Sequence, residues 1–306
     1  MKMLRPLNIY SLLYIETDEE RKLQGRIQHG TARIELFLKN ASLLDLSLKT
    51  LNPDSGGLIL LTNERELIFC LLKKLNYNLE VRQIEFSLDV PKGITFYSAH
   101  FKIDVFRYLG SRPNEEYSIL LDNDVVNLSP FPKVLNEIVS EGSPIVYHVP
   151  INIPDRCWED CKRIDSEAKP VHWSGGEFIG GRSEFFSHLY RNCTYYCEKY
   201  FALTKEPLFH IGDEFLTTLA LDKMWREGLK CYDAYSFNFI KRCWGAYDYI
   251  PLPYAKPILA HLPADKVWLS KWPLDRPFDS KRFQKRYTRH WRLFRMLYSL
   301  KSAICR

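Results

Sequence analysis

The sequence predicts an α/β protein with one mixed central sheet flanked by helices. Strand-like and helix-like patterns alternate through the first half of the chain, which is typical of an open α/β sheet. Hydrophobic residues make up 46% of the 306 residues and charged residues 26%, which excludes a disordered or coiled-coil chain. No repeat, low-complexity linker or change of composition demands a boundary, and we expect one domain over residues 1–280.

The chain begins with a strand pattern and a helix signal. Leu7–Ile15 is mostly apolar and predicts a strand. The run is too short, and with Asn8 and Ser11 too polar, for a signal peptide or a membrane span. Thr17 and Glu20 have the spacing of a capping box, which predicts the start of a helix.

The next segments repeat the order strand, helix, strand. Leu58–Leu61 is a short apolar strand, and Asn63 with Glu66 is expected to cap a helix that ends near Leu75. Leu79–Phe86 alternates between apolar and polar residues, as a further strand would.

Four more elements complete the first half of the chain. They are a helix, a strand, a helix and a strand, over Ser98–Leu109, Tyr117–Leu121, Lys133–Val139 and Pro144–Val149. The first of these strands runs directly into Asp122-Asn123-Asp124. Because ligands of open α/β sheets lie beyond the carboxyl ends of the strands, this is where we expect a site. The second half of the chain is less regular and rich in aromatic residues, Gly and Pro.

Asp122 and Asp124 flank a single residue at the end of an apolar strand. Two carboxylates this close raise each other's pKa unless a cation compensates for them. Mg²⁺ or Mn²⁺ held by such a pair, with positions left for phosphate oxygens, is a recurring design of nucleotide sites. The alternative is an Asp/Asn turn that caps the following helix.

Three motifs of the second half could add to this site. Trp173–Gly181 holds four glycines in nine positions, which indicates close approach to a ligand or positive φ angles, or else a pair of hairpin turns. Asp213 and Glu214 open an amphipathic helix, unless they merely cap it. His261 precedes Lys266 by five residues, so that an imidazole could complete the metal site and an ammonium could neutralise a phosphate.

Eight cysteines, with no export signal, predict reduced thiols in a cytoplasmic protein. Cys157 with Cys161, and Cys193 with Cys197, share a spacing that places each pair on one face of a helix. Zinc sites usually have tighter spacing and histidine partners, so ordinary buried thiols are favoured over a structural metal.

The order of these motifs resembles that of nucleotide-sugar glycosyltransferases of the GT-A (Rossmann-like) fold. The motifs are Ser98–Lys102, Asp122–Asp124, Trp173–Gly181, Asp213 with Glu214, His261 with Lys266 and Trp268, and a basic aromatic tail. They are scattered from about residue 7 to the C-terminus. They are most similar to retaining family 8, which includes bacterial lipooligosaccharide galactosyltransferases and glycogenin. The Gly-Gly and Gly-Asp-Glu segments are also similar to retaining family 6, the blood-group transferases.

The resemblance implies an Mn²⁺- or Mg²⁺-dependent enzyme that moves a hexose from a UDP-sugar to a saccharide or glycolipid, as in lipopolysaccharide biosynthesis. Asp122, Asp124 and His261 would bind the metal. The residues implied to bind the UDP-sugar are Tyr14, Thr17, Lys102, Asp122, Asn123, Asp124, Gly175, Gly176 and Lys266. Tyr14 and Thr17 would lie at the uracil, and Lys266 would reach the diphosphate.

Asp213 and Glu214 are the implied catalytic residues, because either could stabilise an oxocarbenium-like sugar. In an inverting reaction, Asp213 would instead be the general base. The other functions considered are a sugar-phosphate nucleotidylyltransferase and a membrane-tethered module that binds a sugar nucleotide without turning it over.

The net charge of +6 is unevenly distributed. Residues 281–306 hold nine Lys or Arg and no acidic residue, which leaves 34 basic and 37 acidic residues over 1–280. Aromatic residues recur at helical steps in this tail, at Phe283, Tyr287, Trp291, Phe294 and Tyr298. A basic helix with an aromatic face suits an anionic membrane, so we expect a peripheral protein at the inner face of the membrane. The alternatives are a stripe that packs on the body and, less favoured, a nucleic-acid contact; no nucleic-acid partner is expected.

Overall fold

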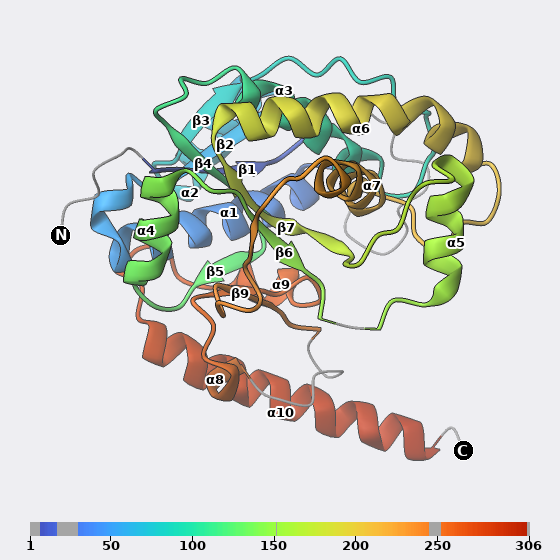
Figure 1. Cartoon of the computed structure of the whole chain (residues 1–306). Helices are drawn as coiled ribbons and strands as arrows, with labels where there is room; N and C mark the ends of the chain where they lie inside the picture. The colour runs from blue at the N-terminus through green and yellow to red at the C-terminus, as the bar shows by residue number, and fades with distance from the viewer. Residues whose placement is uncertain (1–6, 17–29, 151, 245–251, 305–306) are drawn as a thin grey trace.

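Seven strands form the central sheet of the computed structural model (Figure 1). The structure describes residues 7–16, 30–150, 152–244 and 252–304, and the counts below refer to these residues. The strand order is β3-β2-β1-β4-β7-β6-β8. The strands are β1 (Leu7–Leu12), β2 (Leu58–Thr62), β3 (Glu80–Gln83), β4 (Tyr117–Leu121), β6 (Ile145–His148), β7 (Ser174–Gly181) and β8 (Tyr232–Asp233).

The sheet is mixed, as predicted. Strands β3, β2, β1 and β4 run parallel to one another, whereas β7 runs antiparallel to both of its neighbours, β4 and β6. Strands β2, β4 and β6 lie where the sequence predicts them. Strand β1 ends at Leu12 rather than Ile15, and β3 is shorter than the predicted Leu79–Phe86, because the paired registers end there.

Asn63 does not cap α2 (Arg65–Leu75), so that prediction is wrong. Its side-chain oxygen accepts from the Ile15 amide at 2.8 Å, and its Nδ2 donates to the Ile15 carbonyl at 3.0 Å. Helix α2 begins without a side-chain cap. Asn63 therefore anchors the segment that follows β1 at the carboxyl edge of the sheet. The helix start predicted at Thr17 and Glu20 lies outside the described residues.

Helices cover both faces of the sheet (Figure 1). One face carries α3 (Lys102–Gly110), which follows the 3₁₀ turn η2 (Tyr97–Phe101), with α5 (Asp155–Ile164), α6 (Ser183–Leu203) and α7 (Asp213–Arg226). The other face carries α1 (Thr31–Leu51), followed by η1 (Pro53–Ser55), with α2 and α4 (Lys133–Glu141). Leu120 packs with the first set, whereas Ile119 and Leu121 pack with the second. Strands covered on both faces are apolar throughout, which explains the continuous apolar runs.

The glycine-rich segment forms β7, a fully buried strand inside the sheet. The alternative of hairpin turns is therefore wrong. The expectation of positive φ angles is wrong as well, because the four glycines of this strand lie outside the left-handed region. What glycine supplies here is space for close neighbours.

A second, three-stranded sheet carries the C-terminal part of the site. It consists of β5 (Val125–Asn127), β10 (Leu259–His261) and β9 (Ile240–Arg242), in that order. Strand β5 begins directly after Asp124, and antiparallel pairing places His261 of β10 opposite Val125. The short helix α8 (Leu252–Ala255) packs on α10 (Ser280–Ile304), and the short helix α9 (Lys266–Leu269), which follows β10, packs on α1.

The predicted basic C-terminal helix is confirmed as α10, and its first half belongs to the folded body. Phe283, Tyr287 and Trp291 are buried in a core shared with Trp268 and Trp272. The prediction that these three rings lie in a membrane interface is wrong, and the alternative of packing on the body holds for them. None of the described helices has the length and apolar character needed to cross a membrane.

The two predicted cysteine pairs are buried free thiols. Cys157 and Cys161 lie on α5, and Cys193 and Cys197 lie on α6. Burial raises the pKa of each of these thiols, to about 12 for Cys157 and Cys197. Among the described residues, the cysteines belong to no cluster that could hold a metal ion.

Candidate active site

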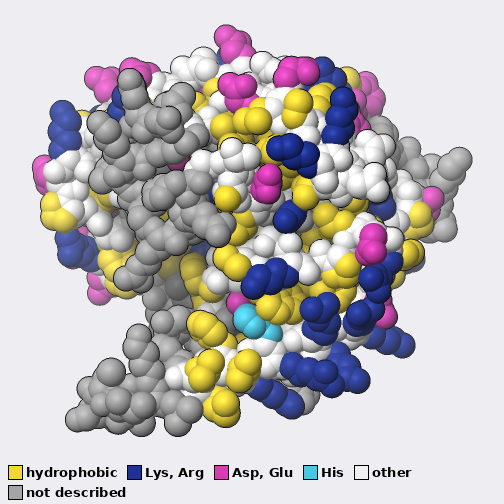
Figure 2. Space-filling model, turned by 180° about the vertical axis from the view of Figure 1, so that it is seen from behind, with side chains coloured by type: hydrophobic (Ala, Val, Ile, Leu, Met, Phe, Trp, Pro, Cys, Tyr) yellow, Lys and Arg dark blue, Asp and Glu magenta, His cyan; other side chains and the backbone are white. Residues whose placement is uncertain are grey.

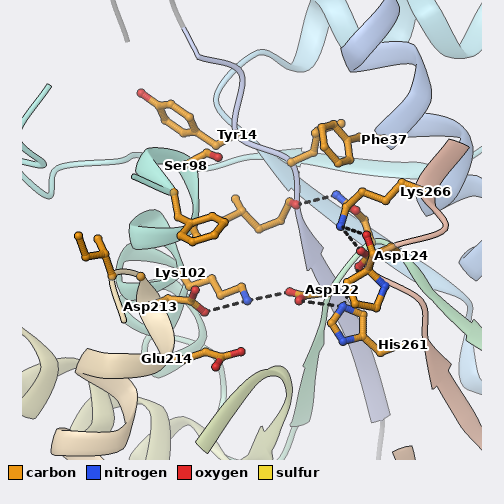
Figure 3. A pocket seen from close by; sticks show the side chains of 18 of the residues that line it. Tyr14, Phe37, Ser98, Lys102, Asp122, Asp124, Asp213, Glu214, His261 and Lys266 are labelled. Atoms are coloured by element: carbon orange, nitrogen blue, oxygen red, sulfur yellow. Dashed lines mark hydrogen bonds and ion pairs between the residues drawn. The ribbon is translucent and has the colours of Figure 1, made fainter. Parts of the chain in front are cut away.

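A cavity of about 580 Å³ opens beyond the carboxyl ends of β1 and β4 (Figure 3). The structure brings most of the predicted site residues to it. The predicted residues that line the cavity are Tyr14, Lys102, Asp122, Asn123, Asp124, Asp213, Glu214, His261 and Lys266. Gly175 and Gly176 lie in β7 beside these side chains, and Thr17 lies outside the described residues.

Asp122, Asp124 and His261 come together as predicted. The Nε2 atom of His261 lies 3.2 Å from Asp124 Oδ1 and 3.5 Å from Asp122 Oδ2. One ligand atom from each residue lies within 4.8 Å of the others. The Asp-Asn-Asp turn links β4 to β5, and α4 has no side-chain cap, so the alternative of a helix cap is wrong.

Each carboxylate of the acidic pair has its own lysine (Figure 3). Lys102 Nζ lies 2.7 Å from Asp122 Oδ1 and 2.9 Å from Asp213 Oδ2. It also donates to the Gly176 carbonyl at 3.0 Å. Lys266 Nζ contacts Asp124 Oδ2 on the other side. The pair is therefore held between two ammonium groups.

Gly176 makes room for the lysine bridge. A Cβ atom at this position would lie 2.3 Å from Asp213 Oδ2 and 2.7 Å from Lys102 Nζ, distances that real Cβ atoms do not adopt. At Gly175, a Cβ atom would lie 2.3 Å from Glu177 Oε2. In this structure, the close approach that the two glycines permit is to side chains of the chain itself.

Asp213 and Glu214 open α7 without capping it. The N-cap residue is Gly212, and no side-chain cap bond forms, so the capping alternative is wrong. Asp213 pairs with Lys102, whereas Glu214 Oε2 accepts from Trp173 Nε1 at 2.8 Å. Both carboxylates face the cavity.

Sequence reasoning missed two residues of the site, Glu177 and Arg242. Arg242 Nε donates to Glu177 Oε1 at 2.5 Å, and its Nη2 contacts both Glu177 and Glu214. Glu177 Oε1 also lies 3.2 Å from His261 Nδ1. A glutamate inside an apolar, glycine-rich strand needs a buried partner, which is a signal that could have pointed to Glu177. Nothing local marks Arg242.

The cluster carries an excess of negative charge. Among its described side chains, five carboxylates stand against three permanent cations; they are Asp122, Asp124, Glu177, Asp213 and Glu214 against Lys102, Arg242 and Lys266. A histidine that binds a metal ion is neutral, and with His261 in that form the excess equals the charge of one divalent cation. Carboxylate oxygens and an imidazole nitrogen are ligands that Mn²⁺ accepts, so the residues fit a divalent ion.

The pKa values follow from burial and from these contacts. Burial raises the pKa of Asp122, and Lys102 opposes that rise. Burial also raises the pKa values of Asp124 and Glu177. Contacts with His261 and Lys266 outweigh burial at Asp124, and contact with Arg242 outweighs it at Glu177. Both pKa values therefore lie well below the usual range. Burial disfavours protonated His261, but Asp124 and Glu177 outweigh it and raise its pKa to about 9.

No protein-family model and no curated protein matches this sequence. Among solved structures, the chain is similar to the apo crystal structure of mouse xyloside xylosyltransferase 1. The similarity covers 85% of this chain and 98% of that chain, at 13% sequence identity and a TM-score of 0.48. A likeness at this level does not assign a function.

Proposed function

We propose that the protein is a metal-dependent glycosyltransferase of the GT-A type that moves a hexose from a UDP-sugar to a saccharide or glycolipid acceptor. The observation that carries the proposal is the meeting of Asp122, Asp124 and His261 beyond the carboxyl end of β4, with ligand atoms within 4.8 Å of one another. The charge excess of the cluster supports a divalent ion. When bound, Mn²⁺ or Mg²⁺ would neutralise the diphosphate and stabilise the charge it gains as it leaves.

Lys266 is the residue proposed to hold the diphosphate. Its side chain is 24% exposed, lines the cavity and contacts one carboxylate, Asp124. On binding, the ammonium would exchange Asp124 for a phosphate oxygen, and the charge-assisted hydrogen bond would strengthen as the leaving group gains charge. Lys102 lies between Asp122 and Asp213 and forms an ion pair with each of them.

Glu214 is the carboxylate proposed to face the reacting carbon. Its position is fixed by Trp173 and Arg242, while its other surface lines the cavity. A fixed carboxylate there can stabilise an oxocarbenium-like sugar. Asp213 is buried beside Lys102, whereas Glu214 is partly exposed at the cavity, which favours Glu214 for this role and with it a retaining reaction. The departing diphosphate would then take the proton of the acceptor hydroxyl.

The aromatic lining near the end of β1 supports a base-binding region. Tyr14 stacks on Phe101 with ring centroids 4.0 Å apart, and Tyr14, Phe37 and Ser98 line the same cavity. A uracil ring would find apolar faces here, while its diphosphate would extend toward Asp122 and Lys266.

The second half of α10 is proposed to contact an anionic membrane. Four large apolar side chains are half-exposed there, at Leu293, Phe294, Met296 and Leu297. Figure 2 shows hydrophobic side chains gathered beside Lys and Arg along the lower edge of the molecule. Apolar residues next to Arg289, Arg292 and Arg295 suit a helix that lies on anionic headgroups.

A screen of UDP-sugars for Mn²⁺-dependent hydrolysis tests the enzymatic proposal. At least one UDP-sugar should be hydrolysed, and Asp124→Ala should abolish turnover while the circular dichroism spectrum is retained. Unchanged turnover in that variant would overturn the metal assignment. A thermal shift with UDP and Mn²⁺ but no hydrolysis of any sugar would indicate a binding module instead.

Vesicle flotation tests the membrane contact. Deleting α10 would remove three core rings, so point variants are better suited than truncation. The wild-type protein should bind anionic vesicles but not neutral ones. The double variant Phe294→Ser with Leu297→Ser should no longer bind anionic vesicles. Equal flotation of the variant and the wild type would refute the contact.

A further inference from the structure

Helix α10 contacts the segment that carries Lys266 through one carboxylate, that of Asp265. The Tyr287 hydroxyl donates to Asp265 Oδ2 at 2.8 Å, and His290 Nε2 lies 2.9 Å from Asp265 Oδ1. Asp265 is buried, and both of its oxygens are engaged by this one helix. The residue next to it in the chain is Lys266.

Asp265 occupies the N-cap position of α9, yet its side chain makes no cap bond. An aspartate at this position ordinarily accepts from the backbone N–H groups of its own helix, which stabilises the first turn. Here the carboxylate is directed to Tyr287 and His290 instead. The Asp265 carboxylate therefore stabilises a tertiary contact with α10 and leaves the first turn of α9 without a side-chain cap.

Trp268 provides a second point of attachment. Its ring stacks on His290 with centroids 5.3 Å apart and an interplanar angle of 21°. It also meets Phe283 and Tyr287 edge to face, at 5.3 and 5.4 Å. Asp265 before Lys266 and Trp268 after it are therefore bound to α10, while the Lys266 ammonium contacts Asp124 in the cavity.

A helix as short as α9 cannot fix Lys266 by itself. It has four residues, and a helix of one turn is unstable in water without tertiary contacts. Val267, next to Lys266, is exposed, and Leu269 at the end of α9 is buried in the core beside α1. The start of α9, which carries Lys266, thus depends on what holds Asp265 and Trp268.

We propose that Tyr287 and His290 are positioning residues that hold Lys266 where it meets the diphosphate of the donor. The C-terminal helix would then set the affinity for the diphosphate without touching the ligand. This inference rests on the proposed function, since it assigns Lys266 to a diphosphate.

The test compares ligands with and without phosphates in the full-length chain. The variant Tyr287→Phe with His290→Ala removes both contacts to Asp265, and Gln284→Ala is the matched control. Gln284 lies on the same helix but bonds to Ser280. We expect the double variant to bind UDP, with Mn²⁺ present, about tenfold more weakly, and to bind uridine as the wild type does. The control should retain both affinities.

Hydrogen exchange of residues 262–269 in the free protein gives a readout that needs no nucleotide. The double variant should exchange faster there than the wild type and Gln284→Ala. Unchanged UDP affinity, an equal loss for UDP and uridine, or unchanged exchange would each overturn the proposal. If the wild type binds no UDP, the proposed function fails, and the exchange comparison alone decides whether α10 fixes the Lys266 segment.

Discussion

Lys102 and Lys266 serve the same acidic pair from two regions of the molecule that are built differently. Lys102 begins α3, which packs on α6 in the main core, and its side chain is 9% exposed. It contacts two carboxylates and a carbonyl. Lys266 lies on the four-residue α9, is 24% exposed, pairs with one carboxylate and donates to the Pro263 carbonyl at 3.2 Å.

The difference indicates that Lys102 stabilises the fold, whereas Lys266 is available to bind a ligand. Lys102 is nearly buried, and losing it would leave two carboxylates without their shared cation. Lys266 keeps an exposed surface toward the cavity and can exchange its single carboxylate for a phosphate. Two lysines that look alike in the sequence therefore differ in what their removal should cost.

The largest effect is expected for Lys102→Met. Breaking a buried ion pair from one side costs about 3–5 kcal/mol, because an unpaired charge stays buried. Urea unfolding should show a loss of this size. Lys266→Met should lose less stability, because the ammonium is partly exposed and Asp124 keeps its contact with His261. Equal losses of stability in the two variants would contradict the different roles assigned to the two lysines.

A smaller loss of stability is expected for Gly176→Ala, which fills the space that Lys102 and Asp213 share. Overpacking of a fitted site typically costs about 1–3 kcal/mol. The same urea experiment measures it. Gly176 lies outside the left-handed region, so Ala at this position adds overpacking without the strain of a positive φ angle. An unchanged free energy of unfolding would show that Lys102 and Asp213 can move aside.

In Lys266→Met, the affinity for UDP with Mn²⁺ should fall about tenfold to a hundredfold, because one charge-assisted hydrogen bond is lost. Isothermal titration calorimetry measures the change, and Lys266→Arg should recover part of it. Wild-type affinity in Lys266→Met would remove this lysine from the diphosphate site.

Glu177→Gln should lower the affinity for Mn²⁺ about tenfold, since the carboxylate behind a metal-binding histidine orients its ring. Calorimetric titration of Mn²⁺ checks this without any nucleotide. Melting temperatures show whether the variant remains folded. A folded variant that binds Mn²⁺ as the wild type does would mean that Glu177 serves Arg242 and not His261.

The features predicted correctly are those whose cause is local in the chain. Strand β4 and the carboxylates that follow it are adjacent in sequence, so apolar residues next to Asp122 and Asp124 predict both the strand and its place at the edge of the sheet. The glycine-rich segment was not recognised as a strand, because glycine is uncommon inside strands. Its use inside β7 depends on Lys102 and Asp213, which come from distant parts of the chain.

Long-range pairs could not be predicted. Arg242 finds Glu177 and Glu214 across the fold, and no spacing in the sequence encodes that contact. The helical spacing of the aromatic residues in the tail correctly predicted that they share one face of a helix. It could not say whether Phe283 and Tyr287 would meet lipid or Trp268, because both surfaces are apolar.

The place of β7 in the sheet has a consequence for how the chain folds. This strand lies between β4 and β6, both of which precede it in the sequence, whereas the sheet neighbours of β6 in the described residues, β7 and β8, both follow it. Until the ribosome has released β7, β4 presents an unpaired edge and β6 has no partner strand, and such strands readily pair with other chains. A folding intermediate that lacks β7 would thus be the state in which this protein is most prone to aggregate.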